Sequence, residues 1–226
     1  MPRPLARNPW AIMQPRGLYA IVDVDATNRA GLAVIEFTRA IVEAKPAMLQ
    51  LRAKSLGARD YLALLEAVAP IARAARVPFI ANDRPDLAWL AGCDGVHVGQ
   101  TDLPVEAVRR FRRELVVGVS THNRAQMMTA VESYPSYVAV GPIYETASKL
   151  GAESSVGLEL LREAQQIGNR TQIPVVAIGG ITLERAKQLR NWAEYAAVIA
   201  ALIPKDGRLP TATRLAEEFH ATLCER

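Results

Sequence analysis

Short apolar runs alternate with amphipathic stretches along almost the whole chain. Several of the runs are apolar at every position, which is typical of parallel strands buried beneath helices. We predict strands at residues 18–22, 48–52, 78–81, 95–98, 115–119, 137–140, 174–178 and 196–201. Between them, amphipathic helices are predicted at residues 58–75, 104–113, 124–132, 158–167 and 183–192.

The number of strand–helix units decides between two α/β architectures. Eight units in about 210 residues predict a (β/α)8 TIM barrel. A doubly wound open sheet usually has fewer strands and a GxGxxG glycine pattern after its first strand, but here that strand runs into Asp23-Val24-Asp25-Ala26. Because no linker or shift in composition divides the chain, we expect one barrel domain at residues 17–226. A basic, Pro-rich N-terminal extension at residues 1–16 precedes it.

Composition narrows the classes of partner. The net charge is +4, and no Lys/Arg run resembles a nucleic-acid-binding stripe. No apolar run approaches the roughly 18 residues of a membrane span, and Cys93 and Cys224 form no CxxC motif. We therefore expect a cytoplasmic protein that binds small anionic molecules, with no nucleic-acid or membrane partner. A homo-oligomer remains open.

Two neighbouring strands each end just before an aspartate, in the stretch FIANDRPDLAWLAGCDGVHVGQTD at residues 79–102. In a barrel, the carboxyl ends of all the strands surround one mouth, where the active site lies, so Asp83 and Asp102 are expected to converge. Each aspartate could instead simply cap the next helix. Two convergent carboxylates without a histidine or thiolate cluster favour Mg²⁺.

Other strand ends are polar in a way that complements these carboxylates. Gln50 and Arg52 share one face of their strand by alternation, and an arginine pointing into a barrel requires an anion. Together with Lys54 and Lys149, Arg52 forms the cationic side of a predicted diphosphate site. The loop at residues 144–157 is long and polar, as expected of a lid or phosphate clamp.

A second anion site is predicted on the other side of the mouth. Gly179-Gly180 follows the seventh strand, and backbone amides follow the eighth, where this fold commonly holds a phosphate monoester. The two glycines could also form a plain tight turn. Together the two sites imply two anionic substrates.

Six ordered motifs within residues 17–203 resemble the thiamine-phosphate synthase family, also called thiamine-phosphate pyrophosphorylase. They are QLRAK (50–54), ND (82–83), DGVHVGQTD (94–102), GVSTH (118–122), GPIYETASK (141–149) and IGGI (178–181). The resemblance implies a transferase that joins 4-amino-2-methyl-5-hydroxymethylpyrimidine diphosphate to 4-methyl-5-(2-phosphoethyl)thiazole. The products would be thiamine phosphate and diphosphate.

The resemblance also implies a role for each matching residue. Asp83 and Asp102 would hold Mg²⁺, and Arg52, Lys54, Ser120 and Lys149 would form the catalytic set. The pyrimidine diphosphate would be held by that set together with Gln50 and Asn82. The thiazole phosphate would be held by Thr146, Ser148, Gly180, Ile199 and Ala200.

Some positions depart from the family pattern, and alternatives follow from them. Ser148 stands where the family usually has threonine, and Ala200 where it usually has serine. The ETASK segment is also similar to the related thiazole tautomerases, same-fold isomerases in which a histidine such as His122 would transfer a proton. We assign His122 a supporting role instead. The remaining alternative is a non-catalytic binding paralogue of the thiamine pathway.

Overall fold

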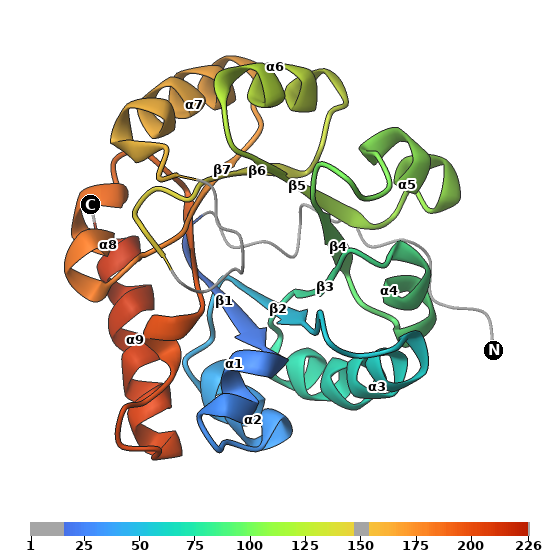
Figure 1. The fold of residues 1–226 in the computed structure, drawn as a ribbon, viewed down its shortest axis with the longest axis vertical. Coiled ribbons are helices and arrows are strands. Elements are labelled where there is room, and N and C mark those ends of the chain that lie inside the picture. The colour runs from blue at the N-terminus through green and yellow to red at the C-terminus, as the bar shows by residue number, and fades with distance from the viewer. Residues whose placement is uncertain (1–15, 147–153, 226) are drawn as a thin grey trace.

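Eight parallel strands close into a barrel in sequence order, with helices around its outside (Figure 1). The structure, a computed structural model, describes residues 16–146 and 154–225. It confirms the predicted (β/α)8 fold. The strands are β1 (Gly17–Asp23), β2 (Met48–Arg52), β3 (Phe79–Asn82), β4 (Gly95–Val98), β5 (Val116–Thr121), β6 (Tyr137–Val140), β7 (Val175–Ile178) and β8 (Tyr195–Val198).

The outer layer contains more helices than the hydrophobic pattern predicted. Two helices follow β1 where none was predicted, and a long helix lies near the end of the chain. The helices are α1 (Val24–Arg29), α2 (Val34–Glu43), α3 (Ala58–Ala75), α4 (Pro85–Ala91), α5 (Val105–Phe111), α6 (Arg124–Glu132), α7 (Gly157–Thr171), α8 (Leu183–Leu189), η2 (Ala200–Leu202, a 3-10 turn) and α9 (Leu209–Cys224).

The last strand is shorter than predicted. The apolar run at residues 196–201 suggested one continuous strand, but β8 ends at Val198 and a 3-10 turn begins at Ala200. Ile199 has φ −117° and ψ −83°, outside the extended region. An apolar run alone cannot reveal such a turn because apolar residues continue on both sides of it.

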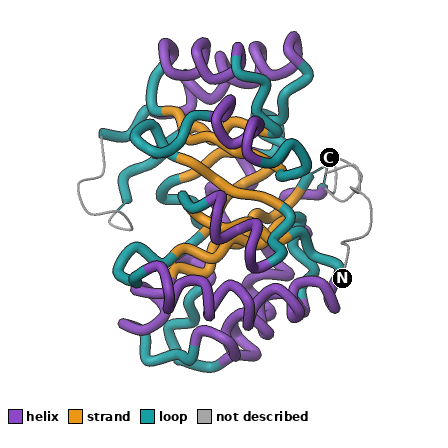
Figure 2. Tube along the Cα trace, turned by 90° about the vertical axis from the view of Figure 1, so that its right-hand side faces the viewer, coloured by secondary structure: helices purple, strands orange, loops and turns teal. Residues whose placement is uncertain are grey.

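Two apolar cores share the strands. Alternate side chains of each strand pack outward against the helices, among them Leu18, Leu49 and Val138. The intervening side chains fill the inside of the barrel, among them Tyr19, Met48 and Tyr137. Figure 2 shows the barrel from the side, with the strands between layers of helix.

Strand register brings polar residues together at the carboxyl end of the barrel. On β1 and β2, Ile21 pairs with Gln50 and Asp23 pairs with Arg52. Gln50 and Arg52 therefore follow Met48 on the inward-facing side of β2. The inside of the barrel thus changes from apolar at the amino end of the strands to polar at the carboxyl end.

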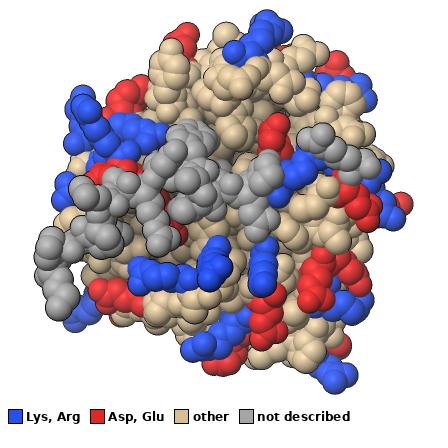
Figure 3. Space-filling view, turned by 180° about the vertical axis from the view of Figure 1, so that it is seen from behind, with Lys and Arg blue, Asp and Glu red and all other residues tan. Residues whose placement is uncertain are grey.

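Among the described residues, no helix is long and apolar enough to cross a membrane. On the face drawn in Figure 3, basic and acidic side chains are interspersed in small groups rather than gathered into a stripe of one sign. The expectations of a cytoplasmic location and of no nucleic-acid partner stay predictions.

Candidate active site

A polar pocket of about 300 Å³ lies at the carboxyl end of the barrel. It brings together eight of the predicted site residues: Gln50, Arg52, Lys54, Asn82, Asp83, Asp102, Ser120 and Ile199. Thr146, Gly180 and Ala200 are described by the structure but do not line this pocket. Ser148, Lys149 and half of the predicted lid, residues 147–153, lie outside the described residues.

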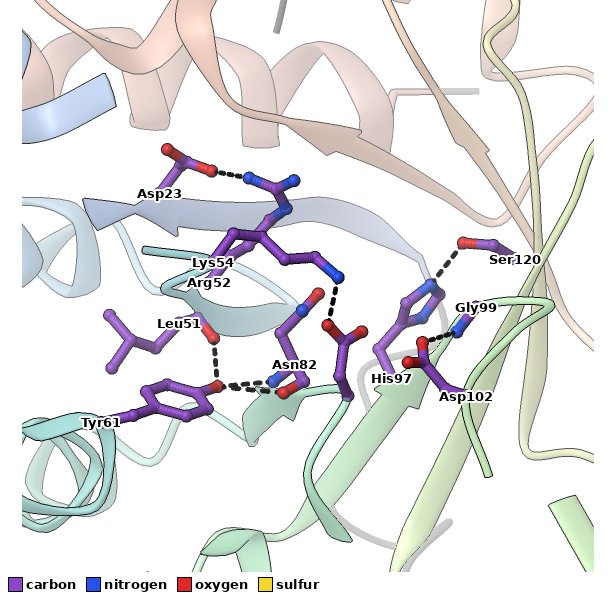
Figure 4. Close-up of polar contacts among 11 residues, drawn as sticks. Asp23, Leu51, Arg52, Lys54, Tyr61, Asn82, His97, Gly99, Asp102 and Ser120 are labelled. Atoms are coloured by element: carbon purple, nitrogen blue, oxygen red, sulfur yellow. Dashed lines mark hydrogen bonds and ion pairs between the residues drawn. The ribbon is translucent and has the colours of Figure 1, made fainter. Parts of the chain in front are cut away.

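Arg52 enters the pocket from the end of β2 and is held there by Asp23. Its Nη1 donates to Asp23 Oδ2, and Asp23 is only 3% exposed (Figure 4). The second carboxylate oxygen of Asp23 accepts from the amide of Ala26 at 2.8 Å, which caps α1. One buried carboxylate therefore both begins a helix and orients a cation. Asp23 was not among the site residues predicted from the sequence, although its position at the end of the first strand was a signal.

Lys54, Asp83 and Asp102 form a charged group on the adjacent side of the mouth. Lys54 Nζ is paired with Asp83 Oδ2. Burial raises the pKa of Asp83, and the neighbouring negative charge of Asp102 raises it further, whereas the ammonium of Lys54 acts in the opposite direction. The carboxylates thus converge as predicted, close enough to repel each other, and a cation between them would relieve that repulsion.

Neither aspartate caps the helix that follows it, so the capping alternative is wrong. The N-cap of α4 is Arg84 and that of α5 is Pro104, and neither cap makes a side-chain hydrogen bond. Asp83 instead has φ 63° and donates its amide to the carbonyl of His97 at 2.8 Å. Aspartate tolerates this left-handed conformation better than most residues, and here it turns the chain at the end of β3.

Asp102 is held by the turn that follows β4. Its Oδ2 accepts from the amide of Gly99 at 2.7 Å. A methyl group on Gly99 would lie 3.1 Å from the same oxygen, so glycine keeps the turn tight. The GQTD motif therefore orients its own carboxylate.

Tyr61, on α3, ties the ends of β2 and β3 together. Its hydroxyl accepts from the amide of Asn82 at 2.8 Å and lies 2.9 Å from the carbonyl oxygen of Leu51, to which it donates (Figure 4). Tyr61 is buried. This bond from helix to strand fixes the two strand ends that carry Arg52 and Asp83.

His122 lies at the pocket wall, beyond the end of β5. Its Nδ1 lies 2.5 Å from the carbonyl oxygen of Gly141, to which it donates, and its backbone amide donates to Gln126 Oε1 at 2.7 Å. These bonds fix the orientation of the imidazole. His122 also lines the pocket, and its supporting role stays a prediction.

The glycine turn after β7 is packed against the loop after β6. Gly179 and Gly180 both have positive φ, 99° and 63°, and a methyl group on Gly180 would lie 2.5 Å from the carbonyl oxygen of Glu145. Arg185 Nη1 donates to the Gly180 carbonyl at 2.6 Å, and its guanidinium stacks 4.4 Å from the ring centre of Tyr144. The turn is thus a close-packed junction. It places Arg185 beside the predicted phosphate site, and this cation was not predicted from the sequence.

The donor set of the pocket suits a hard cation such as Mg²⁺. Asp83 and Asp102 supply carboxylate oxygens, which are the preferred ligands of Mg²⁺, a cation that usually retains several waters and binds substrate phosphates. Within residues 16–146 and 154–225, no cluster of three or more His, Cys, Asp or Glu side chains could hold a metal. A metal bound here would therefore share its coordination between two carboxylates and oxygens from water and substrate.

A closed eight-stranded barrel with a polar pocket at the carboxyl ends of its strands is the architecture of a (β/α)8 enzyme. Residues 18–202 match the family model described as thiamine monophosphate synthase, and the chain belongs to that family. It is an enzyme of the transferase class.

Individual relatives agree with this assignment. The chain is 40% identical over 188 residues to the thiamine-phosphate synthase of Roseiflexus sp., covering 82% of this chain and 78% of the relative. It is 40% identical over 196 residues to that of Thermus thermophilus, covering 86% and 88%. The solved structure of thiamine phosphate pyrophosphorylase from Pyrococcus furiosus superposes with a TM-score of 0.79 at 26% identity, covering 92% of this chain and 96% of that one.

Proposed function

We propose that this enzyme condenses 4-amino-2-methyl-5-hydroxymethylpyrimidine diphosphate with 4-methyl-5-(2-phosphoethyl)thiazole, in a Mg²⁺-assisted reaction that yields thiamine phosphate and diphosphate. The observation that carries the proposal is the convergence of Arg52 and Lys54 with the carboxylates Asp83 and Asp102 in one pocket. That combination suits a diphosphate held through a divalent cation. The family membership of the chain supports the same reaction.

Asp83 and Asp102 would hold the Mg²⁺, which neutralises charge on the departing diphosphate. For Asp83 to bind it, Lys54 must leave the carboxylate with which it is paired. Because Lys54 is 51% exposed, its side chain can turn toward a diphosphate oxygen without losing buried contacts. Lys54 thus exchanges one anionic partner for another when substrate binds.

Arg52 acts as a preoriented cation. Its guanidinium has five N–H donors, and Asp23 holds it at the inner wall of the pocket. It can therefore bind a diphosphate oxygen while Asp23 remains paired with it, and little reorganisation is needed as the charge of the leaving group develops.

The reaction needs orientation and exclusion of water rather than an enzyme nucleophile. The C–O bond to diphosphate breaks, leaving a methylene cation that the aminopyrimidine ring stabilises, and the thiazole nitrogen then forms the new C–N bond. One wall of the pocket, beside its polar groups, is apolar and is formed by Ala139, Ile178 and Ala197. A cation formed against such a wall is shielded from water, which would convert it to the pyrimidine alcohol.

The direct test is to incubate the purified protein with both substrates and Mg²⁺ and to measure thiamine phosphate and diphosphate. We expect both products in equal amounts. Omitting the thiazole phosphate should abolish formation of thiamine phosphate. Absence of thiamine phosphate with both substrates and Mg²⁺ present would refute the proposal.

The position of His122 at the pocket wall leaves the thiazole tautomerase reaction as the second candidate. The two reactions differ in the residues that they require. Synthase activity predicts that Arg52→Ala weakens binding of the pyrimidine diphosphate far more than binding of the thiazole phosphate. Tautomerase activity predicts that His122→Ala abolishes turnover and that the pyrimidine diphosphate does not bind. Calorimetry with each ligand separates the two.

A further inference from the structure

A chain of buried hydrogen bonds crosses the floor of the pocket inside the barrel. Gln50 Nε2 donates to the Tyr19 hydroxyl at 2.6 Å, which lies 2.8 Å from the Tyr137 hydroxyl. The Tyr137 hydroxyl is 3.1 Å from His97 Nδ1, and His97 Nε2 is 2.8 Å from Ser120 Oγ. All five side chains are buried, and four of them, Gln50, Tyr19, His97 and Ser120, line the pocket.

We propose that this chain runs in one direction only, from the Gln50 amide to the Ser120 hydroxyl, so that His97 is held as the Nε2–H tautomer and Ser120 donates its proton into the pocket. This proposal rests on the proposed function and deepens it. It makes Tyr19, Tyr137 and His97 positioning residues for a substrate-binding hydroxyl.

The direction follows from the number of protons that each group can donate. An amide NH₂ can only donate, so the Tyr19 oxygen accepts from Gln50 and its own proton goes to Tyr137. Tyr137 has then accepted one proton and donates its own to His97 Nδ1. A neutral imidazole that accepts at Nδ1 carries its proton at Nε2, which donates to Ser120 Oγ. The proton of the Ser120 hydroxyl is left to point into the pocket.

The opposite direction would leave a buried donor without an acceptor. If His97 Nδ1 donated to Tyr137, and Tyr137 donated to Tyr19, the Tyr19 hydroxyl would have no acceptor for its proton among the described residues. Within the described residues, the hydrogen-bond partners of the Tyr19 hydroxyl are Gln50 and Tyr137, and the Gln50 nitrogen cannot accept. Burial raises the pKa of both phenols far above neutrality, so each keeps its single proton.

Packing holds the rings where the chain requires them. The Tyr19 and Tyr137 rings meet edge to face with centroids 5.8 Å apart, and His97 stacks on Tyr137 at 5.6 Å. On β5, Gly118 leaves space for the Tyr137 ring, because a methyl group there would lie 2.0 Å from that ring. The Gly-Val-Ser segment at residues 118–120 therefore supplies both the space for the chain and its last hydroxyl.

This direction matches the charge of the proposed substrate. A Ser120 that donates adds a fixed donor to the cationic group formed by Arg52 and Lys54, and it would bind an acceptor atom of the pyrimidine diphosphate. A Ser120 that gave its proton to His97 would instead present lone pairs to that substrate. Preorganised donors need no reorientation during the reaction.

Measuring which tautomer His97 adopts is the direct test of this direction. In protein labelled with ¹⁵N-histidine, two-dimensional ring spectra distinguish an imidazole protonated at Nε2 from one protonated at Nδ1. The protein has three histidines, and comparison with His97→Gln identifies the His97 signals. We expect the Nε2–H pattern in the ligand-free protein at neutral pH. An Nδ1–H pattern would overturn the proposal.

Variants test whether the phenols impose this tautomer. Tyr137→Phe keeps the ring but removes the hydroxyl, so His97 should become a mixture of tautomers and kcat/KM should fall about tenfold. Tyr134→Phe is the control, since Tyr134 is 77% exposed and does not line the pocket. It should leave the tautomer and the activity unchanged. A Tyr137→Phe protein with the wild-type tautomer or wild-type activity would contradict the positioning role.

Failure of the proposed function would be distinguishable from failure of this inference. The ring spectra need no substrate, so they decide the direction of the chain even if the protein makes no thiamine phosphate. Conversely, an active enzyme with His97 protonated at Nδ1 would keep the function and refute the inference.

Discussion

Asp83 and Asp102 are the side chains on which the metal hypothesis depends. Asp83→Asn and Asp102→Asn would each remove a proposed charged ligand with little change in shape, so we expect turnover to fall by at least about 100-fold. EDTA should have the same effect on the wild type, and added Mg²⁺ should reverse it. Asp86→Asn is a suitable control because Asp86 pairs with Arg84 at the surface. Full activity of the wild type in EDTA would remove the metal from the mechanism.

Asp23 combines two tasks that two substitutions can separate. Asp23→Asn keeps an oxygen that can cap α1 but removes the charge that orients Arg52. Asp23→Ala removes both, so it should be less stable than the asparagine variant by about 1 kcal/mol, the usual cost of losing a cap. Chemical denaturation measures this difference, and both variants should bind the pyrimidine diphosphate more weakly. Equal stability would mean that the capping bond contributes nothing.

Tyr61 shows how a helix supports the pocket through the strands. Tyr61→Phe would leave the amide of Asn82 and the carbonyl of Leu51 without the hydroxyl that bridges them. Burying an unsatisfied polar group costs about 1–3 kcal/mol, and the free energy of unfolding should fall by that amount. Tyr134→Phe, at a site that is 77% exposed, should have no measurable effect. If the two variants unfold at the same denaturant concentration, the bridge does not stabilise the strand ends.

Ligand binding should stabilise the whole barrel, because the pocket draws residues from several strands. At a ligand concentration 100 times Kd, the free energy of unfolding rises by about 2.7 kcal/mol, which corresponds to about 5–10 °C in Tm for a chain of this size. We expect such a shift with Mg²⁺ and diphosphate together. Differential scanning fluorimetry checks it, with Arg52→Ala, which lacks one of the cations proposed to bind diphosphate, as the control. An equal shift in that variant would place the binding site elsewhere.

The fold and the polar strand ends could be predicted from the sequence pattern. The period of the apolar runs reflects local burial, so the strands and the longer helices could be predicted, and alternation placed Gln50 and Arg52 on one face. Asp83 and Asp102 could be identified because they directly follow buried runs.

The partners of these side chains depend on how the strands come together in three dimensions. Asp23 meets Arg52 because β1 and β2 pair in one register. Tyr19 and Tyr137, 118 residues apart, share a hydrogen bond because the barrel closes. No local pattern records such contacts, since they depend on strand register and closure rather than on neighbours in the chain. For the same reason, the turn at Ile199 and the Lys54–Asp83 pair were not evident before the barrel was assembled.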